Sequence, residues 1–361
     1  MKKLTTPFNE KGLNLKNHVV MAPMTRSRAI DNLPNDLMAE YYHQRTGAGL
    51  IISEGTAPAP EALGYPRIPG AFSGVQTEAW KKVTSRVHRE GSKIFLQLMH
   101  TGRIAHKDNM SGGTDPVGPS RIPADGEIFT DTEGPQPHTQ PKALTKEGIN
   151  SVINGFVKAA QNAVDAGFDG VEIHGANGYL LEQFLNPNVN TRTDEYGGST
   201  ENRSRLTVEV VQAVSSAIGS DRVGIRFSPF STLGDLQPYN EEKVHQTYAH
   251  LAQSMNDEAI AYLHIGMNDE IPQRTFDAIR ANYSGTIILC NGLTPETAEE
   301  KLNEGFADLT AFGRSFLANP DFVERIKEDA PLNDVDFDTL YTPGPEGYTD
   351  YPTLNSQLET A

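Results

Sequence analysis

The sequence predicts a (β/α)₈ barrel, and three observations support this fold class. Short β-rich runs alternate with segments of helical period, eight such runs can be counted, and no Pro/Gly/Ser-rich linker divides the 361 residues. Strands that alternate with helices pair in parallel through crossovers, and eight such units close into a barrel. An open doubly wound sheet is the main competing fold, but no GxGxxG motif follows the first strand. We therefore expect one barrel domain over residues 1–361.

The expected strands are short apolar runs, of the kind that parallel sheets bury on both faces. In chain order they cover Val19–Ala22, Leu50–Glu54, Lys93–Leu98, Gly170–His174, Val223–Phe227, Tyr262–Ile265, Thr286–Leu289 and Leu309–Phe312. Most are flanked by a segment of helical period, and the clearest of these segments are Thr77–Glu90, Lys146–Ala166 and Asn202–Ile218.

Two segments fall outside this repeat. Leu4–Lys16 resembles a small hairpin and is expected to plug the N-terminal end of the barrel. Residues 101–141 follow the third strand, are rich in Gly, Pro, Asp and Thr, and are expected to form a long lid over the C-terminal face. A disordered insertion is the alternative, but Ile122, Ile128 and Phe129 give the segment apolar side chains with which to pack.

Composition and charge exclude several classes of function. The formal net charge of −16 argues against a surface for nucleic acid or anionic membranes. The first residues lack the apolar core of a signal peptide, and no apolar run approaches the length of about 18 residues that a membrane span needs. Cys290 is the only cysteine, which excludes intrachain disulfides and a cysteine-ligated iron–sulfur cluster. His100, His106 and His138 match no metal-ligand spacing, so we expect no metal. The acidic composition and the single cysteine favour a cytoplasmic protein.

The most informative residues follow the expected fourth strand. His174 ends an apolar run, Asn177 follows three residues later, and Tyr179 comes two residues after that. Residues three apart face the same way on a helical turn, so His174 and Asn177 are able to donate hydrogen bonds to one oxygen. Tyr179 then supplies a proton beside that oxygen, a combination that stabilises an enolate-like transition state. The alternative interpretation is that His174 and Asn177 only cap the following helix.

Other polar residues and glycines lie at the ends of distant strands, where barrels of this kind carry their active sites. They are Thr25, Gly55, Gln97, His174, Arg226, Gly292, Gly313 and Arg314. The last three lie after the seventh and eighth strands, in loops that commonly bind phosphate, and arginine matches phosphate well. A surface ion pair is the alternative for Arg314. One phosphate site favours a mononucleotide such as FMN over FAD.

Residues 171–205 resemble the signature of the old yellow enzyme family, the flavin-dependent ene-reductases. The match comprises His174, Asn177–Leu180, Gln183–Leu185 and Asn190–Arg203. Further matches in Ala22–Arg26 and Glu346–Pro352 extend the resemblance over nearly the whole chain. It implies non-covalently bound FMN, with NADPH or NADH as a transient reductant, and reduction of C=C bonds that a carbonyl, imide or nitro group activates.

The resemblance also implies residue roles. Thr25 and Gln97 correspond to residues that hydrogen-bond the flavin ring, Pro23 and Met24 belong to the same cofactor-binding motif, and Arg226 corresponds to the arginine beside the N1/O2 edge. In the family, the residue that matches Tyr179 protonates the substrate Cα while the flavin delivers hydride to Cβ. Tyr65 and Tyr351 match aromatic positions of the substrate pocket, and packing is the alternative for both.

The departures from the family pattern concern the substrate pocket. Many relatives have tryptophan where this chain has Met99, so substrate size and facial selectivity are open. Thr25 stands where another branch of the family has cysteine. Two alternatives remain: a related flavin barrel that acts on nitrate esters or nitroaromatics, and a barrel that binds flavin or a ligand without turnover. We expect small-molecule alkenes as substrates and a monomer or homodimer.

Overall fold

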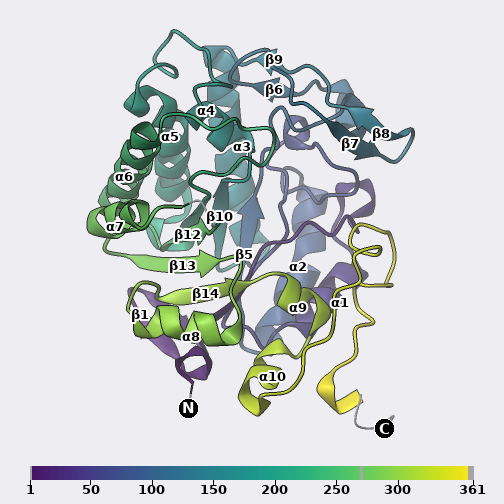
Figure 1. Cartoon of the computed structure of the whole chain (residues 1–361). Coiled ribbons are helices and arrows are strands. Elements are labelled where there is room, and N and C mark those ends of the chain that lie inside the picture. Colours follow the sequence, from purple (N-terminus) through teal and green to yellow (C-terminus); the bar gives the residue numbers. More distant parts are fainter. Residues whose placement is uncertain (1, 269–270, 357–361) are drawn as a thin grey trace.

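The computed structural model describes residues 2–268 and 271–356, and eight parallel strands close into a barrel (Figure 1). The strands are β3 (Val19–Met21), β4 (Leu50–Ile52), β5 (Lys93–Leu98), β10 (Gly170–Gly175), β11 (Val223–Phe227), β12 (Tyr262–Gly266), β13 (Thr286–Cys290) and β14 (Leu309–Phe312). Each strand pairs with the next in this order, and β14 pairs with β3 to close the ring. The predicted (β/α)₈ barrel is confirmed. Every strand begins where the sequence predicted, and the ends differ by at most two residues.

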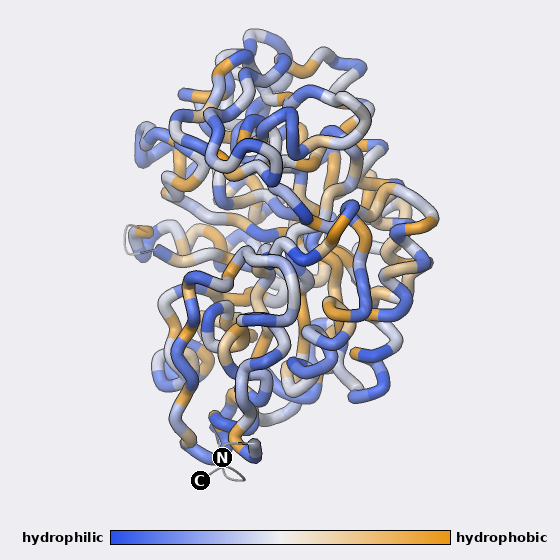
Figure 2. The backbone as a smooth tube through the Cα atoms, turned by 90° about the vertical axis from the view of Figure 1, so that its right-hand side faces the viewer, coloured by the Kyte–Doolittle hydropathy of each residue, from blue (hydrophilic) through white to orange (hydrophobic). Residues whose placement is uncertain are grey.

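Helices connect the strands and cover the outside of the barrel. They are α1 (Asp36–Gln44), α2 (Gly74–Arg89), α3 (Lys146–Asp165), α4 (Leu180–Leu185), α5 (Thr200–Ile218), α6 (Glu241–Glu258), α7 (Gln273–Asn282), α8 (Pro295–Asn303), α9 (Arg314–Ala318) and α10 (Phe322–Glu328). Polar side chains start several of them, as where Ser73 and Gln76 form a capping box at α2. Figure 2 shows hydrophobic residues along the inner segments and hydrophilic residues on many outer loops.

The N-terminal hairpin packs into the N-terminal end of the barrel, as predicted. It consists of β1 (Phe8–Glu10) and β2 (Leu13–Leu15). Phe8, Leu13 and Leu15 are buried in one cluster with inward residues of the barrel strands, among them Phe95 and Tyr262. Because the hairpin closes this end, the C-terminal ends of the strands are where a ligand has access.

The segment after β5 is ordered rather than disordered. It contains β6 (Val117–Gly118), β7 (Glu127–Thr130), β8 (Gly134–Pro137) and β9 (Lys142–Ala143), paired as β6–β9 and as the hairpin β7–β8. Ile128 is buried with Ile104 and Ala124, and Tyr65 and Tyr179 pack against this cluster. Phe129 is 52% exposed, so it does not anchor the segment as the sequence suggested.

Three buried arginines hold the C-terminal tail onto the barrel. Arg28 donates to the carbonyls of Thr339, Leu340, Gly344 and Glu346. Arg26 and Arg45 donate to tail carbonyls in the same way. Tyr348 stacks on Tyr41 with ring centroids 4.1 Å apart and is fully buried. These contacts fix the tail beside the C-terminal face, where Asp338, Tyr341, Thr342 and Pro343 line the cavity described next.

Candidate active site

A cavity of about 1050 Å³ lies at the C-terminal face of the barrel. Its walls come from the ends of β5, β10 and β11, from the loop after β3, from the hairpin β7–β8 and from the C-terminal tail. The volume is at the upper end of the usual range for ligand sites, about 300–1,000 Å³. Nine of the residues that the sequence predicted line it together: Pro23, Thr25, Tyr65, Gln97, Met99, His174, Asn177, Tyr179 and Arg226.

His174 is a neutral hydrogen-bonding group at the end of β10. Its imidazole is 4% exposed and its Nδ1 atom has no hydrogen-bond partner in the described structure. Burial, reinforced by the positive charges of Arg226 and His264, holds the pKa of His174 well below its usual value. A neutral imidazole carries one N–H and one acceptor nitrogen, so His174 is suited to donate a hydrogen bond to a ligand oxygen rather than to supply a proton.

The alternative role of His174 and Asn177 as helix caps is not supported. The N-cap of α4 is Tyr179, and no side chain caps this position. Asn177 and Gly178 both have positive φ, 56° and 81°, so the chain turns sharply between β10 and α4. A side chain at position 178 would overlap the backbone of Leu233, so only glycine fits there. The turn leaves His174, Asn177 and Tyr179 all at the cavity wall.

Tyr179 is a partly buried phenol that remains protonated. Its ring packs edge-on against His174 with centroids 4.9 Å apart, and its hydroxyl donates to the Tyr65 hydroxyl at 3.2 Å. Burial raises the pKa of Tyr179 well above 10, and the neighbouring Tyr65 raises it further. A phenol in this state carries its proton throughout the physiological pH range and is available as a general acid.

Arg226 places a positive charge in the cavity wall next to His174, its partner in the β10–β11 register. Arg226 is 5% exposed, its Nε atom has no partner, and Nη2 reaches only the Cys290 thiol at 3.8 Å. Among the described residues it forms no ion pair within 4.0 Å, so an ordinary buried ion pair does not account for it. An unpaired buried charge is costly, and an anionic ligand edge in the cavity would offset that cost.

A buried polar network supports the residues next to this cation. The Gln97 amide nitrogen donates to Glu172 at 2.8 Å, and Glu172 meets His264 Nδ1 at 2.8 Å. The network uses the amide nitrogen of Gln97 and leaves its carbonyl oxygen for a ligand. Thr25 lines the same part of the cavity. Donors, acceptors and a cation together fit the polar edge of a flavin, which carries both hydrogen-bonding functions and negative charge when reduced.

The residues predicted for a phosphate lie on the same face but outside the described cavity wall. Gly292 follows β13 with φ 66°, Asn291 before it has φ 76°, and nothing lies within 4 Å of where a Gly292 Cβ would be. Gly313 begins α9 beside Met24, whose sulfur would be 3.4 Å from an added Cβ. The Arg314 guanidinium is exposed and lies 5.5 Å from the centre of the Phe337 ring. This open backbone with an adjacent cation fits a phosphate.

Met99 and Gly55 occupy adjoining positions in the pocket wall. Met99 is buried in a cluster with Ala57, Leu63 and Ile68. A Cβ at Gly55 would lie 2.5 Å from the Met99 sulfur. Gly55 therefore has a packing role against Met99 beside any contact with a cofactor.

The structure does not bring Tyr351 to the cavity. Its hydroxyl accepts a hydrogen bond from the Asp336 backbone N–H at 2.9 Å, because the tail turns away after the buried Tyr348. Tyr341 lines the cavity in its place, and the sequence analysis missed it. It also missed Arg67, which pairs with Asp131 of the β7–β8 connection and donates to the Tyr341 carbonyl. No local pattern marks either residue, since both contacts join segments that are far apart in the chain.

Three further findings concern Cys290, metal binding and membrane spans. Cys290 is buried at the end of β13. Over the described ranges, no group of three or more His, Cys, Asp or Glu side chains is arranged to hold a metal ion. In the same ranges, no helix has the length and apolar character needed to cross a bilayer.

Comparison with known proteins assigns this site to a family. The pattern of the NADH:flavin oxidoreductase / NADH oxidase family matches residues 3–333. 12-oxophytodienoate reductase 1 of Oryza sativa subsp. japonica is 42% identical over 362 residues, covering 97% of this chain and 93% of the relative. The chain belongs to the old yellow enzyme family. Another member, 12-oxophytodienoate reductase 2 of Arabidopsis thaliana, is 40% identical over 98% of this chain and 96% of the relative.

Solved structures of old yellow enzymes share the whole fold. Morphinone reductase superimposes with a TM-score of 0.94 at 41% identity, covering 99% of this chain and 97% of the other. Morphinone reductase in complex with tetrahydroNAD gives a TM-score of 0.94 at 42% identity, covering 98% of both chains. This chain is accordingly an FMN-dependent oxidoreductase that takes electrons from a nicotinamide dinucleotide and reduces activated C=C bonds.

Proposed function

We propose that the chain is an ene-reductase in which His174 and Asn177 bind the activating oxygen of an alkene and Tyr179 protonates its α carbon. When bound, FMN supplies the hydride that it has taken from the nicotinamide, and this hydride adds to the β carbon. The observation that carries the proposal is the grouping of a neutral imidazole, a carboxamide and a protonated phenol on one wall of a cavity that also contains Arg226.

Each side chain has a separate part in the reaction. Hydrogen bonds from His174 and Asn177 to the carbonyl, imide or nitro oxygen strengthen as that oxygen gains negative charge, so they lower the barrier. Proton transfer from the Tyr179 hydroxyl to the α carbon completes the saturation of the double bond. For the cofactor, we propose that Thr25, Gln97 and Arg226 hold the ring, with Pro23 and Met24 beside it. The phosphate would lie at Gly292, Gly313 and Arg314, and Gly55 would approach the ring through its backbone.

The substrate wall consists of Tyr65, Met99 and Tyr341, and we propose that these residues decide which alkenes enter. We propose that the protein is a monomer or a homodimer. A reducing compartment such as the cytoplasm remains the proposed location, because the single cysteine, Cys290, is buried and takes part in no disulfide. A related activity on nitrate esters would use the same residues and differ only in the oxidant.

The proposed function is tested by colour and by two half-reactions. Purified protein is expected to be yellow, or to become yellow on addition of FMN, and to release the chromophore on denaturation. Anaerobic NADH or NADPH should bleach it, and 2-cyclohexenone should restore the colour. A protein that binds no FMN on reconstitution contradicts the proposal. Bleaching by NADH without reoxidation by any enone or nitroalkene would instead favour the nitrate-ester alternative or a barrel without ene-reductase turnover.

The mouth of the cavity carries negative charge, and we expect NADH to be the better reductant. Asp125, Glu127 and Asp338 are exposed there and form no ion pair within the described residues, whereas Arg67 is paired with Asp131. Burial lowers the pKa of His138, so this histidine adds little positive charge. The 2′-phosphate of NADPH adds roughly −1.5 to −2 charges, which this mouth repels.

The expected preference is measurable in the reductive half-reaction. At low ionic strength kcat/KM for NADH should exceed that for NADPH by about tenfold, and added salt should reduce the ratio. The double variant Asp125→Asn/Glu127→Gln should reduce the difference in kcat/KM between NADH and NADPH. Asp221→Asn, at the opposite end of the barrel, serves as the control. Equal use of both dinucleotides at low salt, or a preference for NADPH, would show that these carboxylates do not select the reductant.

A further inference from the structure

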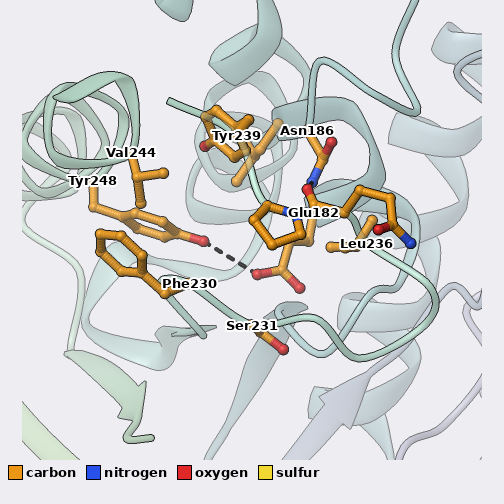
Figure 3. Close-up of a pocket in the computed structure, with 11 residues that line it drawn as sticks. Glu182, Asn186, Phe230, Ser231, Leu236, Tyr239, Val244 and Tyr248 are labelled. Atoms are coloured by element: carbon orange, nitrogen blue, oxygen red, sulfur yellow. Dashed lines mark hydrogen bonds between the residues drawn. The ribbon is translucent and has the colours of Figure 1, made fainter. Parts of the chain in front are cut away.

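A buried carboxylate lies directly behind the active-site turn. Glu182 belongs to α4, is 4% exposed, and has no cation as an ion-pair partner among the described residues. Its Oε2 atom accepts the backbone N–H of Gly178 at 2.6 Å, and its Oε1 atom accepts the Ser228 hydroxyl at 2.7 Å. Tyr248 donates to the same Oε1 at 3.1 Å, as Figure 3 shows.

Ser228 extends this contact to the neighbouring residue of the turn. It follows β11, and the pairing of Gly175 with Phe227 in the β10–β11 register places it beside the turn. Its oxygen accepts the backbone N–H of Asn177 at 2.8 Å while its hydroxyl hydrogen goes to Glu182. The two consecutive N–H groups of the left-handed turn thus both end at Glu182, one directly and one through Ser228.

From these contacts we infer that Glu182 and Ser228 are positioning residues that fix the turn and thereby aim the Asn177 carboxamide and the Tyr179 phenol into the cavity. Neither residue lines that cavity. The inference rests on the proposed function, since it concerns the oxygen-binding wall of that same site. It goes beyond ordinary capping because the groups held are those of residues 177 and 178, which precede the N-cap of α4.

The hydrogen-bond donors around Glu182 stabilise its charged form, which burial disfavours. Burial raises the pKa of Glu182 to about 7, and the Gly178 N–H and the Ser228 and Tyr248 hydroxyls act in the opposite direction. A small cavity of about 50 Å³ borders the carboxylate, and its walls include Phe230, Leu236 and Val244 (Figure 3). Polar residues such as Asn186, Ser231 and Gln237 also line this cavity, but the hydrogen bonds described for the carboxylate come from Gly178, Ser228 and Tyr248.

Glutamine at position 182 is the informative substitution. Its single amide oxygen is able to accept from Gly178 or from Ser228, but not from both sides at once. Ser228→Ala removes the link to Asn177 only. Tyr248→Phe is the matched control, because it removes one donor to the same carboxylate and leaves both contacts to the turn in place.

Five measurements test the inference. They are FMN content, melting temperature, the Kd of 4-hydroxybenzaldehyde from its absorbance change, kcat and KM for 2-cyclohexenone, and backbone hydrogen exchange at the turn. Glu182→Gln and Ser228→Ala should retain FMN, weaken 4-hydroxybenzaldehyde binding and lower kcat for the enone by about 10- to 100-fold, as misplaced active-site groups do. Tyr248→Phe should stay within about twofold of the wild type, because its loss does not touch the turn. Backbone hydrogen exchange should rise at residues 177 and 178 in Glu182→Gln and at residue 177 in Ser228→Ala, and it should not rise in Tyr248→Phe.

Two results would overturn the inference. One is a lower melting temperature in Glu182→Gln and Ser228→Ala with unchanged phenol affinity and kcat per bound FMN, which would make both residues purely structural. The other is unchanged hydrogen exchange at the turn, which does not depend on activity and applies even if one variant folds poorly. A wild-type protein that reduces no enone would contradict the proposed function instead, and the exchange data would still decide whether Glu182 and Ser228 hold the turn.

Discussion

Replacing Tyr179 with phenylalanine should slow the reduction of an enone by about 10²–10⁴-fold, the usual contribution of a positioned general acid. The substitution keeps the ring against His174 and removes only the hydroxyl. Reduction of the flavin by NADH requires no proton from Tyr179, so its rate should stay near that of the wild type. Stopped-flow measurement of the two half-reactions separates these effects.

Tyr65→Phe provides the control for this experiment. It removes the acceptor of the Tyr179 hydrogen bond, whose oxygens lie 3.2 Å apart, but leaves the proton donor in place, so its effect should be small. Nitroalkenes should also suffer less in Tyr179→Phe, because their nitronate forms first and takes a proton from solvent later. If Tyr179→Phe slows flavin reduction and leaves enone reduction intact, the role assigned to Tyr179 is wrong.

Loss of the Arg226 charge should have the second largest effect. If Arg226 lies beside the flavin as proposed, Arg226→Ala would remove the cation that stabilises the reduced, anionic ring, and truncation of one partner of a buried charge pair typically costs about 2–5 kcal/mol. The cost falls mainly on the reduced form, so the two-electron potential of bound FMN should drop by about 40–110 mV, since 30 mV corresponds to about 1.4 kcal/mol. Redox titration measures this drop, and fluorescence titration measures any loss of FMN affinity.

Arg226→Lys is the matched control for charge. Lysine keeps the positive charge but loses the planar fork of the guanidinium. Arg226→Lys should therefore recover much of the redox potential of bound FMN, but less of the affinity for FMN, which depends on the geometry of the fork. Unchanged FMN content and an unchanged potential in Arg226→Ala would remove Arg226 from the cofactor site.

The strands were predictable because their signal is local. A strand buried on both faces must be apolar along its length, so each barrel strand is visible in the sequence as a short apolar run with clear ends. The helices follow from their period and caps, as at Ser73. The residues at the strand ends could then be placed on one face by topology alone, which is why Gln97, His174 and Arg226 were found to line one cavity.

The tail and the turn were not predictable in the same way. Tyr341 lines the cavity because Arg28, more than three hundred residues earlier, holds the neighbouring carbonyls. Tyr351 was assigned by position in a motif, but its hydroxyl is used by the Asp336 backbone. Glu182 showed one local sign, an acidic residue at the third position of α4, a place where glutamate commonly accepts backbone N–H groups. Its partner Ser228 becomes visible only when β10 and β11 are paired.

The contact between Gly55 and Met99 constrains how this pocket can evolve. Alanine at position 55 would lie 2.5 Å from the Met99 sulfur, so it is acceptable only if the thioether first moves or shortens. A lineage that enlarges residue 99 leaves less room for a side chain at position 55, whereas one that first shrinks residue 99 opens that route. The order in which the two mutations occur therefore determines which substrate pockets this barrel is able to reach.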